Sequence, residues 1–73
     1  MPIKNHRKVL GENIRRLRKR KGLSQEQLAE AADFSSNFVG EIERGEKAAS
    51  IDSLVKFAAA LKVKVSELVR RLG

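Results

Sequence analysis

The segment 23–45, LSQEQLAEAADFSSNFVGEIERG, constrains the fold of this chain more than any other part. Ser24, with Gln27 three residues later, forms the S-x-x-Q pattern of a helix that begins with a capping box. Asp33 is a residue type that tolerates the left-handed backbone conformation of a sharp turn. Gly45 stands where a second helix would end, because glycine is favoured just past the last helical turn. The segment therefore predicts two short helices joined by a tight turn, residues 25–32 and 36–44.

The outer face predicted for the second helix is short and polar. Val39 and Ile42 are predicted to face inward, and Ser35 or Ser36 can cap the first turn. A short polar face on a helix that is held at both ends suits insertion into the major groove of DNA. The residues on this face are Ser36, Asn37, Gly40, Glu41 and Arg44.

Helical periodicity continues outside this segment, and no strand is predicted. Leu10, Ile14 and Leu17, for example, recur at the spacing of one helix face. Residues 1–7 are predicted to be a flexible basic arm, and residues 8–73 a single small domain. The three further helices are predicted at residues 8–21, 51–61 and 65–72.

The charge balance favours a polyanionic partner. The chain has 73 residues, of which 16 are Lys or Arg and 9 are Asp or Glu, so its net charge is +7. A field of this strength attracts nucleic acid, although charge alone is equally compatible with a solvated basic surface. A membrane-binding helix is less well supported, because the chain has no Trp or Tyr to accompany the basic residues.

The residue types that catalysis and metal binding need are scarce. There is no cysteine and His6 is the one histidine, so we expect no enzyme activity, no metal, no cofactor and no small-molecule ligand. No apolar run approaches the roughly 18 residues of a membrane span. The N-terminal residues lack the apolar core of a signal peptide, which predicts a cytoplasmic protein.

Three sequence blocks occur in an order and spacing that indicate a family. They are IRRLRKRKGLSQEQLAE, VGEIERGEK and SIDSLVKFAAALKVKVSELV, and together they span about residues 9–69. On these blocks the chain resembles the Cro/C1, or XRE, class of helix-turn-helix DNA-binding domains. The resemblance implies an all-α fold, a compact five-helix lambda-repressor-like domain that contains a helix-turn-helix.

The resemblance implies that Ser36, Asn37 and Glu41 reach base edges. Asn can form two hydrogen bonds with adenine, and Glu can accept one from the cytosine amino group. Ser35 is a further candidate contact, although Ser35 or Ser36 can act only as a helix cap. Gly40 costs roughly 1 kcal/mol relative to Ala in a helix interior. Its small size either allows a close approach to DNA or is simply tolerated.

Phosphate contacts are expected beside the reading helix. Gln25 lies in the first turn of a predicted helix, where backbone N–H groups can hold a phosphate. The resemblance implies that Ser24 and Gln25 act together there, although Ser24 can also serve as a cap alone. Arg44 and Lys47 resemble positions that contact the DNA backbone. Glu41 would be repelled by phosphates, so it can instead pair with Arg44 or Lys47.

Two other sets of residues have structural interpretations. By resemblance, Arg18 and Glu43 form an ion pair that joins the first helix to the end of the reading helix, and the planar fork of Arg suits such a pair. Phe34, Phe38 and Phe57 could stack on single-stranded bases. A core position is the better interpretation for Phe34 and Phe57, with Phe38 partly exposed.

Four residues depart from the family pattern. Asp33 and Lys62 stand where glycine is usual, Ala49 replaces a common proline, and Lys64 replaces a serine cap. These departures predict weaker local caps and a less certain course for residues 62–66.

The predicted function is sequence-specific binding of double-stranded DNA by a transcriptional regulator. A homodimer would bind a pseudo-palindromic operator whose half-sites lie about one helical turn (~34 Å) apart. Its size resembles the controller proteins of restriction-modification systems. The alternatives are an antitoxin with a toxin partner and a coactivator-type protein-interaction module. The residues that would form the dimer interface, or else cover the monomer core, are Val65, Leu68, Val69 and Leu72.

Overall fold

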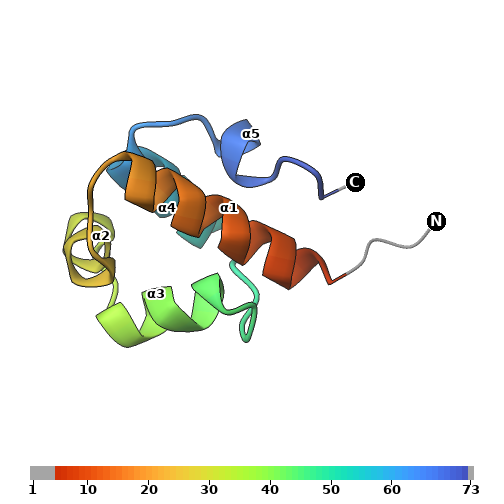
Figure 1. The fold of residues 1–73 in the computed structure, drawn as a ribbon, viewed down its shortest axis with the longest axis horizontal. Helices are drawn as coiled ribbons and strands as arrows, with labels where there is room; N and C mark the ends of the chain where they lie inside the picture. Colours follow the sequence, from red (N-terminus) through yellow and green to blue (C-terminus); the bar gives the residue numbers. More distant parts are fainter. Residues whose placement is uncertain (1–4, 73) are drawn as a thin grey trace.

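The computed structural model describes residues 5–72. This part of the chain forms five helices and no strand, which confirms the predicted all-α fold class. The predictions for residues 25–32 and 51–61 match the structure to the residue, and the other helices differ at their ends. The helices are α1, His6–Arg20; α2, Gln25–Ala32; α3, Ser36–Glu43; α4, Ile51–Leu61; and α5, Val65–Leu68 (Figure 1).

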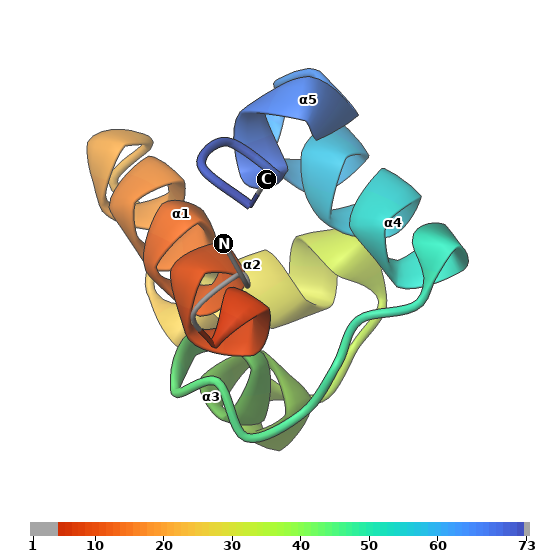
Figure 2. The ribbon, with the colours of Figure 1, turned by 90° about the vertical axis from the view of Figure 1, so that its right-hand side faces the viewer.

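The arrangement of the helices leaves one face of α3 uncovered. α2 and α3 pack on each other, and α2 also packs on α4. α1 contacts α3 on one side and α5 on the other (Figure 1). Figure 2 shows α3 and α5 at opposite ends of the molecule, with α1 and α4 between them.

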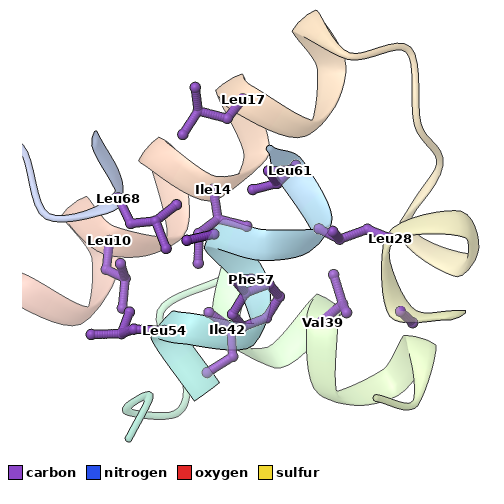
Figure 3. Packing of buried hydrophobic residues seen from close by; sticks show 12 residues of the cluster. Leu10, Ile14, Leu17, Leu28, Val39, Ile42, Leu54, Phe57, Leu61 and Leu68 are labelled. Carbon is purple, nitrogen blue, oxygen red and sulfur yellow. The ribbon is translucent and has the colours of Figure 1, made fainter. Parts of the chain in front are cut away.

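The core sets the orientation of α3, because every helix contributes to it (Figure 3). Phe57 of α4 is fully buried, as are Val39 and Ile42 of α3. Burying a side chain of this size stabilises the fold by roughly 1.5–3 kcal/mol. Since Val39 and Ile42 hold one side of α3 against the core, its opposite side faces solvent.

The caps predicted for the helix-turn-helix are present. Ser24 Oγ accepts from the Gln27 backbone N–H at 3.0 Å, and Gln27 Oε1 accepts from the Ser24 N–H at 2.8 Å. Ser35, rather than Ser36, caps α3, because its Oγ accepts from the Phe38 N–H at 3.0 Å. Asp33 adopts the left-handed conformation, with φ 61°. The turn is therefore made without the usual glycine.

α1 begins earlier than the sequence predicted. Its first residue is His6, and the side chain of Asn5 caps it by accepting from the Lys8 N–H at 3.2 Å. The predicted arm, residues 1–7, therefore overlaps the first helical turn. Its residues 1–4 lie outside the described part of the chain.

α5 is shorter than predicted, because it ends at Leu68 rather than Leu72. Lys64 makes no side-chain hydrogen bond to cap its start, and Lys62 adopts a left-handed conformation with φ 59°. Asn13 of α1 binds two backbone carbonyl groups, one at the end of α5 and one beyond it. Asn13 Nδ2 donates to the backbone oxygens of Leu68 at 2.9 Å and of Arg70 at 2.8 Å.

Candidate nucleic-acid interface

An open hollow lies between the start of α2 and the outer face of α3. We call it the α2–α3 hollow. It brings together six residues that the sequence predicted to contact DNA, and adds Glu26 to them. The lining residues are Ser24, Gln25, Glu26, Ser36, Asn37, Gly40 and Arg44.

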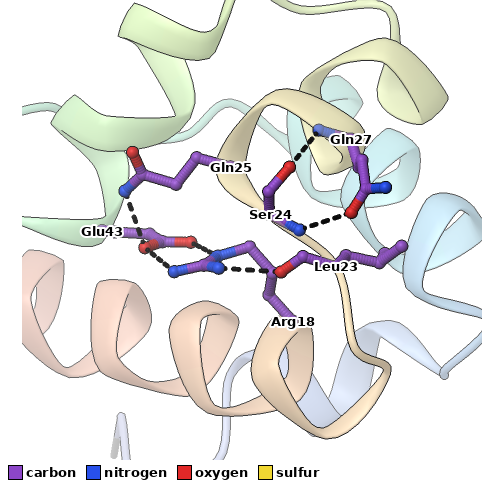
Figure 4. Close-up of polar contacts among 6 residues, drawn as sticks. All are labelled: Arg18, Leu23, Ser24, Gln25, Gln27 and Glu43. Atoms are coloured by element: carbon purple, nitrogen blue, oxygen red, sulfur yellow. Dashed lines mark hydrogen bonds and ion pairs between the residues drawn. The ribbon is translucent and has the colours of Figure 1, made fainter.

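A buried ion pair supports the hollow from beneath. Arg18 Nε donates to Glu43 Oε2 at 2.7 Å and Arg18 Nη2 to Glu43 Oε1 at 3.1 Å. The side chains are only 10% and 3% exposed. Arg18 Nη1 also donates to the Leu23 carbonyl oxygen at 2.8 Å (Figure 4). The pair implied by the resemblance therefore joins α1, the loop before α2 and the end of α3.

The same ion pair orients Gln25. Gln25 Nε2 donates to Glu43 Oε1 at 3.0 Å (Figure 4). Because an ionised carboxylate can only accept hydrogen bonds, the amide nitrogen must be the atom that faces Glu43. The outward atom is then Oε1, an acceptor that does not bind a phosphate oxygen. Any phosphate contact in this arrangement falls to the backbone N–H groups at the start of α2, which have no intrahelical acceptor by position.

Ser36 and Asn37 are the exposed side chains at the start of α3 that line the hollow. Both lie in the first turn, just after the Ser35 cap. The first residues of a reading helix are the ones that reach base edges in helix-turn-helix complexes. The position of Asn37 is therefore compatible with the base contact expected of it.

Gly40 lines the hollow, as its predicted place on the outer face requires, but it is itself buried. A Cβ atom added there would lie 3.0 Å from Arg44 Nη1 and 3.7 Å from Gln25 Oε1. The guanidinium of Arg44 thus lies across Gly40, and in this arrangement the absent side chain makes room for Arg44.

Two exposed ion pairs follow the reading helix. Lys47 Nζ lies 3.4 Å from Glu41 Oε1, so of the two partners proposed for Glu41 the structure gives Lys47. Arg44 instead pairs with Glu46, through Nε to Oε2 at 2.8 Å and Nη2 to Oε1 at 3.2 Å. The hydrogen bond raises the pKa of Arg44 and lowers the pKa of Glu46 relative to their ordinary values.

The pair of Arg44 with Glu46 was not predicted from the sequence. The signal available was the order Arg-Gly-Glu at residues 44–46. It becomes informative only when Gly45 adopts the left-handed conformation, φ 76°, and turns Glu46 back toward α3.

The apolar residues proposed for a dimer interface differ in exposure. Leu68 is fully buried in the monomer core, so its assignment to the interface is wrong in this structure. Val69 and Leu72 are half-buried against the core, whereas Val65 is 37% exposed. The most exposed large apolar side chains are on α4. They are Ile51, 76% exposed, and Val55, 53% exposed.

The aromatic residues form one cluster. The ring centroids of Phe34 and Phe57 are 4.9 Å apart, and those of Phe34 and Phe38 are 4.8 Å apart. Phe57 is fully buried, while Phe34 and Phe38 are half-buried against the core. Their packing favours the core interpretation over stacking on bases.

The described part of the chain offers neither a metal site nor a membrane-spanning helix. Within residues 5–72, no three His, Cys, Asp or Glu side chains gather as metal ligands would. None of the helices in the described part of the chain is long and apolar enough to cross a membrane.

Comparison with known proteins agrees with this geometry. Control protein C.SmaI of Serratia marcescens is 37% identical over 67 residues, which cover 92% of this chain and 80% of that protein. Control protein C.BamHI of Bacillus amyloliquefaciens is 35% identical over 66 residues, covering 89% and 82% of the two chains. The crystal structure of the restriction-modification controller protein C.AhdI from Aeromonas hydrophila is 39% identical. The matched region covers 85% of this chain and 94% of the C.AhdI chain, and the TM-score is 0.83.

The helix-turn-helix family HTH_3 matches residues 14–68, which include α2, α3, α4 and α5 and the C-terminal part of α1. The chain therefore belongs to the HTH_3 family, the Cro/C1 or XRE class of helix-turn-helix domains that its sequence blocks indicated.

Proposed function

We propose that this protein is a transcriptional regulator that binds double-stranded DNA in a sequence-specific way, with α3 in the major groove. The observation that carries the proposal is the uncovered polar face of α3, held in place by the core beneath it and by the buried Arg18–Glu43 pair. The net charge of +7 supports capture of a polyanion. Such a regulator acts in the cytoplasm and has no catalytic role.

The contacts divide into two kinds. Asn37 and Ser36 read base edges, and Glu41 joins them only if it leaves Lys47. The backbone N–H groups at the start of α2 hold one phosphate, while the side chains of Ser24 and Gln25 fix the position of that helix start. Arg44 and Lys47 hold phosphates on the other side of α3 and contribute affinity more than sequence preference.

Two copies are needed for useful specificity, because one reading helix covers only a few base pairs. We assign the interface between the copies to the α4–α5 side of the domain. Val65 and the half-buried Val69 and Leu72 contribute from the C-terminal part. Ile51 and Val55 add exposed apolar surface from α4, and they share a helix face because they lie four residues apart.

The similarity to controller proteins favours that role within the family. C.SmaI, C.BamHI and C.AhdI carry the controller name and match most of this chain. Their lengths are also comparable, since the matched region covers at least 80% of each of them. We therefore assign this protein a controller role that it exercises through its helix-turn-helix domain.

Selection of bound duplexes from a random pool tests the proposal. The expected result is enrichment of a two-fold symmetric sequence with half-sites about one helical turn apart. Binding to the enriched duplex should weaken steeply with salt. If a dimer neutralises about 6 phosphates, the log–log slope is about −5. An unenriched pool, or binding that barely changes from low to moderate salt, would favour a protein-interaction module instead.

A further inference from the structure

One cationic side chain that we expect to contact DNA, Arg44, is already paired with a carboxylate of the same chain. The guanidinium of Arg44 donates two hydrogen bonds to the carboxylate of Glu46, at 2.8 and 3.2 Å. Two parallel bonds from one guanidinium are also the way in which Arg binds a phosphate. The carboxylate therefore satisfies the same donors that a DNA phosphate would require.

We propose that Glu46 is an internal competitor of DNA, which holds Arg44 in the free protein and gives it up to a duplex phosphate on binding. The proposal rests on the proposed function, because it assumes that Arg44 contacts phosphate. In this account, Glu46 limits the affinity for DNA through Arg44 alone.

The backbone holds the competitor in place. Gly45, with φ 76°, reverses the chain after α3, and the Glu46 N–H then donates to the Glu41 carbonyl oxygen at 2.9 Å. This hydrogen bond fixes the start of the Glu46 side chain next to Arg44. Gly40 completes the arrangement, because a side chain there would meet Arg44 Nη1 at 3.0 Å.

The exposure of the pair makes exchange possible. The Arg44 and Glu46 side chains are 55% and 54% exposed, so water and salt screen their attraction. Exposed pairs of this kind contribute little to folding. A phosphate can therefore replace the carboxylate without disturbing the core beneath α3.

A double-mutant cycle on DNA affinity tests the competition. The four proteins are the wild type, Glu46→Gln, Arg44→Met and the double variant, and the probe is a random-sequence duplex of about two helical turns. Binding is measured by fluorescence anisotropy at about 50 mM salt, where phosphate contacts are strong. We expect Glu46→Gln to tighten binding about three- to tenfold in the presence of Arg44, and less than twofold in its absence.

Glu30→Gln is the matched control, since Glu30 is an exposed carboxylate of α2 outside the α2–α3 hollow. It measures the effect of removing one negative charge, and that effect should be the same with and without Arg44. Thermal melting of every variant checks that each is folded.

Each outcome decides the proposal. Equal tightening by Glu46→Gln in both backgrounds would overturn the competition while leaving Arg44 as a phosphate contact. If Arg44→Met does not weaken duplex binding at all, the proposed role of Arg44 fails, and the competition fails with it. Tightening that depends on Arg44 supports both.

Discussion

Two arginine–glutamate pairs lie at the end of α3, with the same chemistry and opposite surroundings. Arg18 and Glu43 are 10% and 3% exposed, whereas Arg44 and Glu46 are 55% and 54% exposed. The buried pair has additional hydrogen bonds to Leu23 and Gln25, and it connects three parts of the chain. The exposed pair joins residues only two apart in the sequence.

Burial, rather than pairing, decides what Arg18 and Arg44 can each do. Removing one member of a buried pair leaves an uncompensated charge away from water, so the pair must stay together. Members of an exposed pair can change partners at little cost, because water solvates either one alone. The Arg18–Glu43 pair therefore holds the end of α3 in position, and the Arg44–Glu46 pair is available for binding DNA.

The largest effect is expected from breaking the buried pair. Arg18→Ala or Glu43→Ala should each lower the free energy of unfolding by about 3–5 kcal/mol, because the remaining charge is buried without a partner. The same change at the exposed pair, Glu46→Ala, should leave the free energy of unfolding nearly unchanged, because water solvates the remaining charge. Urea unfolding followed by circular dichroism measures both.

The double variant Arg18→Ala, Glu43→Ala sharpens this prediction. It should cost less than the sum of the single variants, because no charge is then left without its partner. Additive losses would remove the proposed energetic coupling between the two residues.

A second substitution tests the close contact between α1 and α3. A Cβ at Gly11 would lie 2.5 Å from the Glu43 carbonyl oxygen and closer still to that of Ile42. Gly11→Ala must therefore push α1 away from α3, at a cost of typically 1–3 kcal/mol. In a helix interior without an obstacle, Gly→Ala is instead stabilising by about 0.5–1 kcal/mol. An unchanged or raised thermal stability of Gly11→Ala would therefore contradict the close crossing.

The proposed dimer interface can be separated from the DNA surface. Val55→Glu places a charge on an exposed apolar position of α4, and in a dimer it would place like charges near the interface. We expect a folded monomer with operator affinity reduced by at least tenfold, about 1.4 kcal/mol. Ala31→Glu, at an exposed position of α2, adds the same charge away from α4 and is the matched control, which should leave the dimer intact. Sedimentation of the wild type as a monomer at tens of micromolar, with or without DNA, would contradict the dimer.

The smallest effect concerns the exposed pair itself. The hydrogen bond from Arg44 lowers the pKa of Glu46 below its ordinary value of 4.5. The stabilisation from the pair is therefore present above the unfolded-state pKa and is lost as the pH falls through the lower folded-state pKa. In an NMR titration, Arg44→Met should move the Glu46 midpoint up toward 4.5. An unchanged midpoint would mean that the two side chains are not paired in solution.

Much of the helix-turn-helix could be predicted because its signals are local. Ser24 and Gln27 form a capping box by their spacing alone, and Asp33 makes the turn that its residue type allows. The Arg18–Glu43 pair was anticipated only through the family resemblance. Its partners are 25 residues apart, and no local rule connects them.

The features that sequence reasoning missed depend on distant backbone groups. Asn13 is fully buried, yet its partners are carbonyl oxygens 55 and 57 residues away, which no pattern around Asn13 identifies. These hydrogen bonds attach the end of α5 and the residues just after it to α1. Apolar periodicity at residues 65–72 could not distinguish a dimer surface from the monomer core, because both require the same residue types.

In the proposed complex, α3 reads the base sequence while the residues beside it hold phosphates. The most direct measurement compares Asn37→Ala with Arg44→Ala on a panel of duplexes, each changed at one base pair of the selected site. We expect Asn37→Ala to lose about 1–3 kcal/mol of discrimination at one position of each half-site. Arg44→Ala should weaken binding to every duplex by a similar factor. The same profile for both variants across the panel would contradict the division of roles on which this account rests.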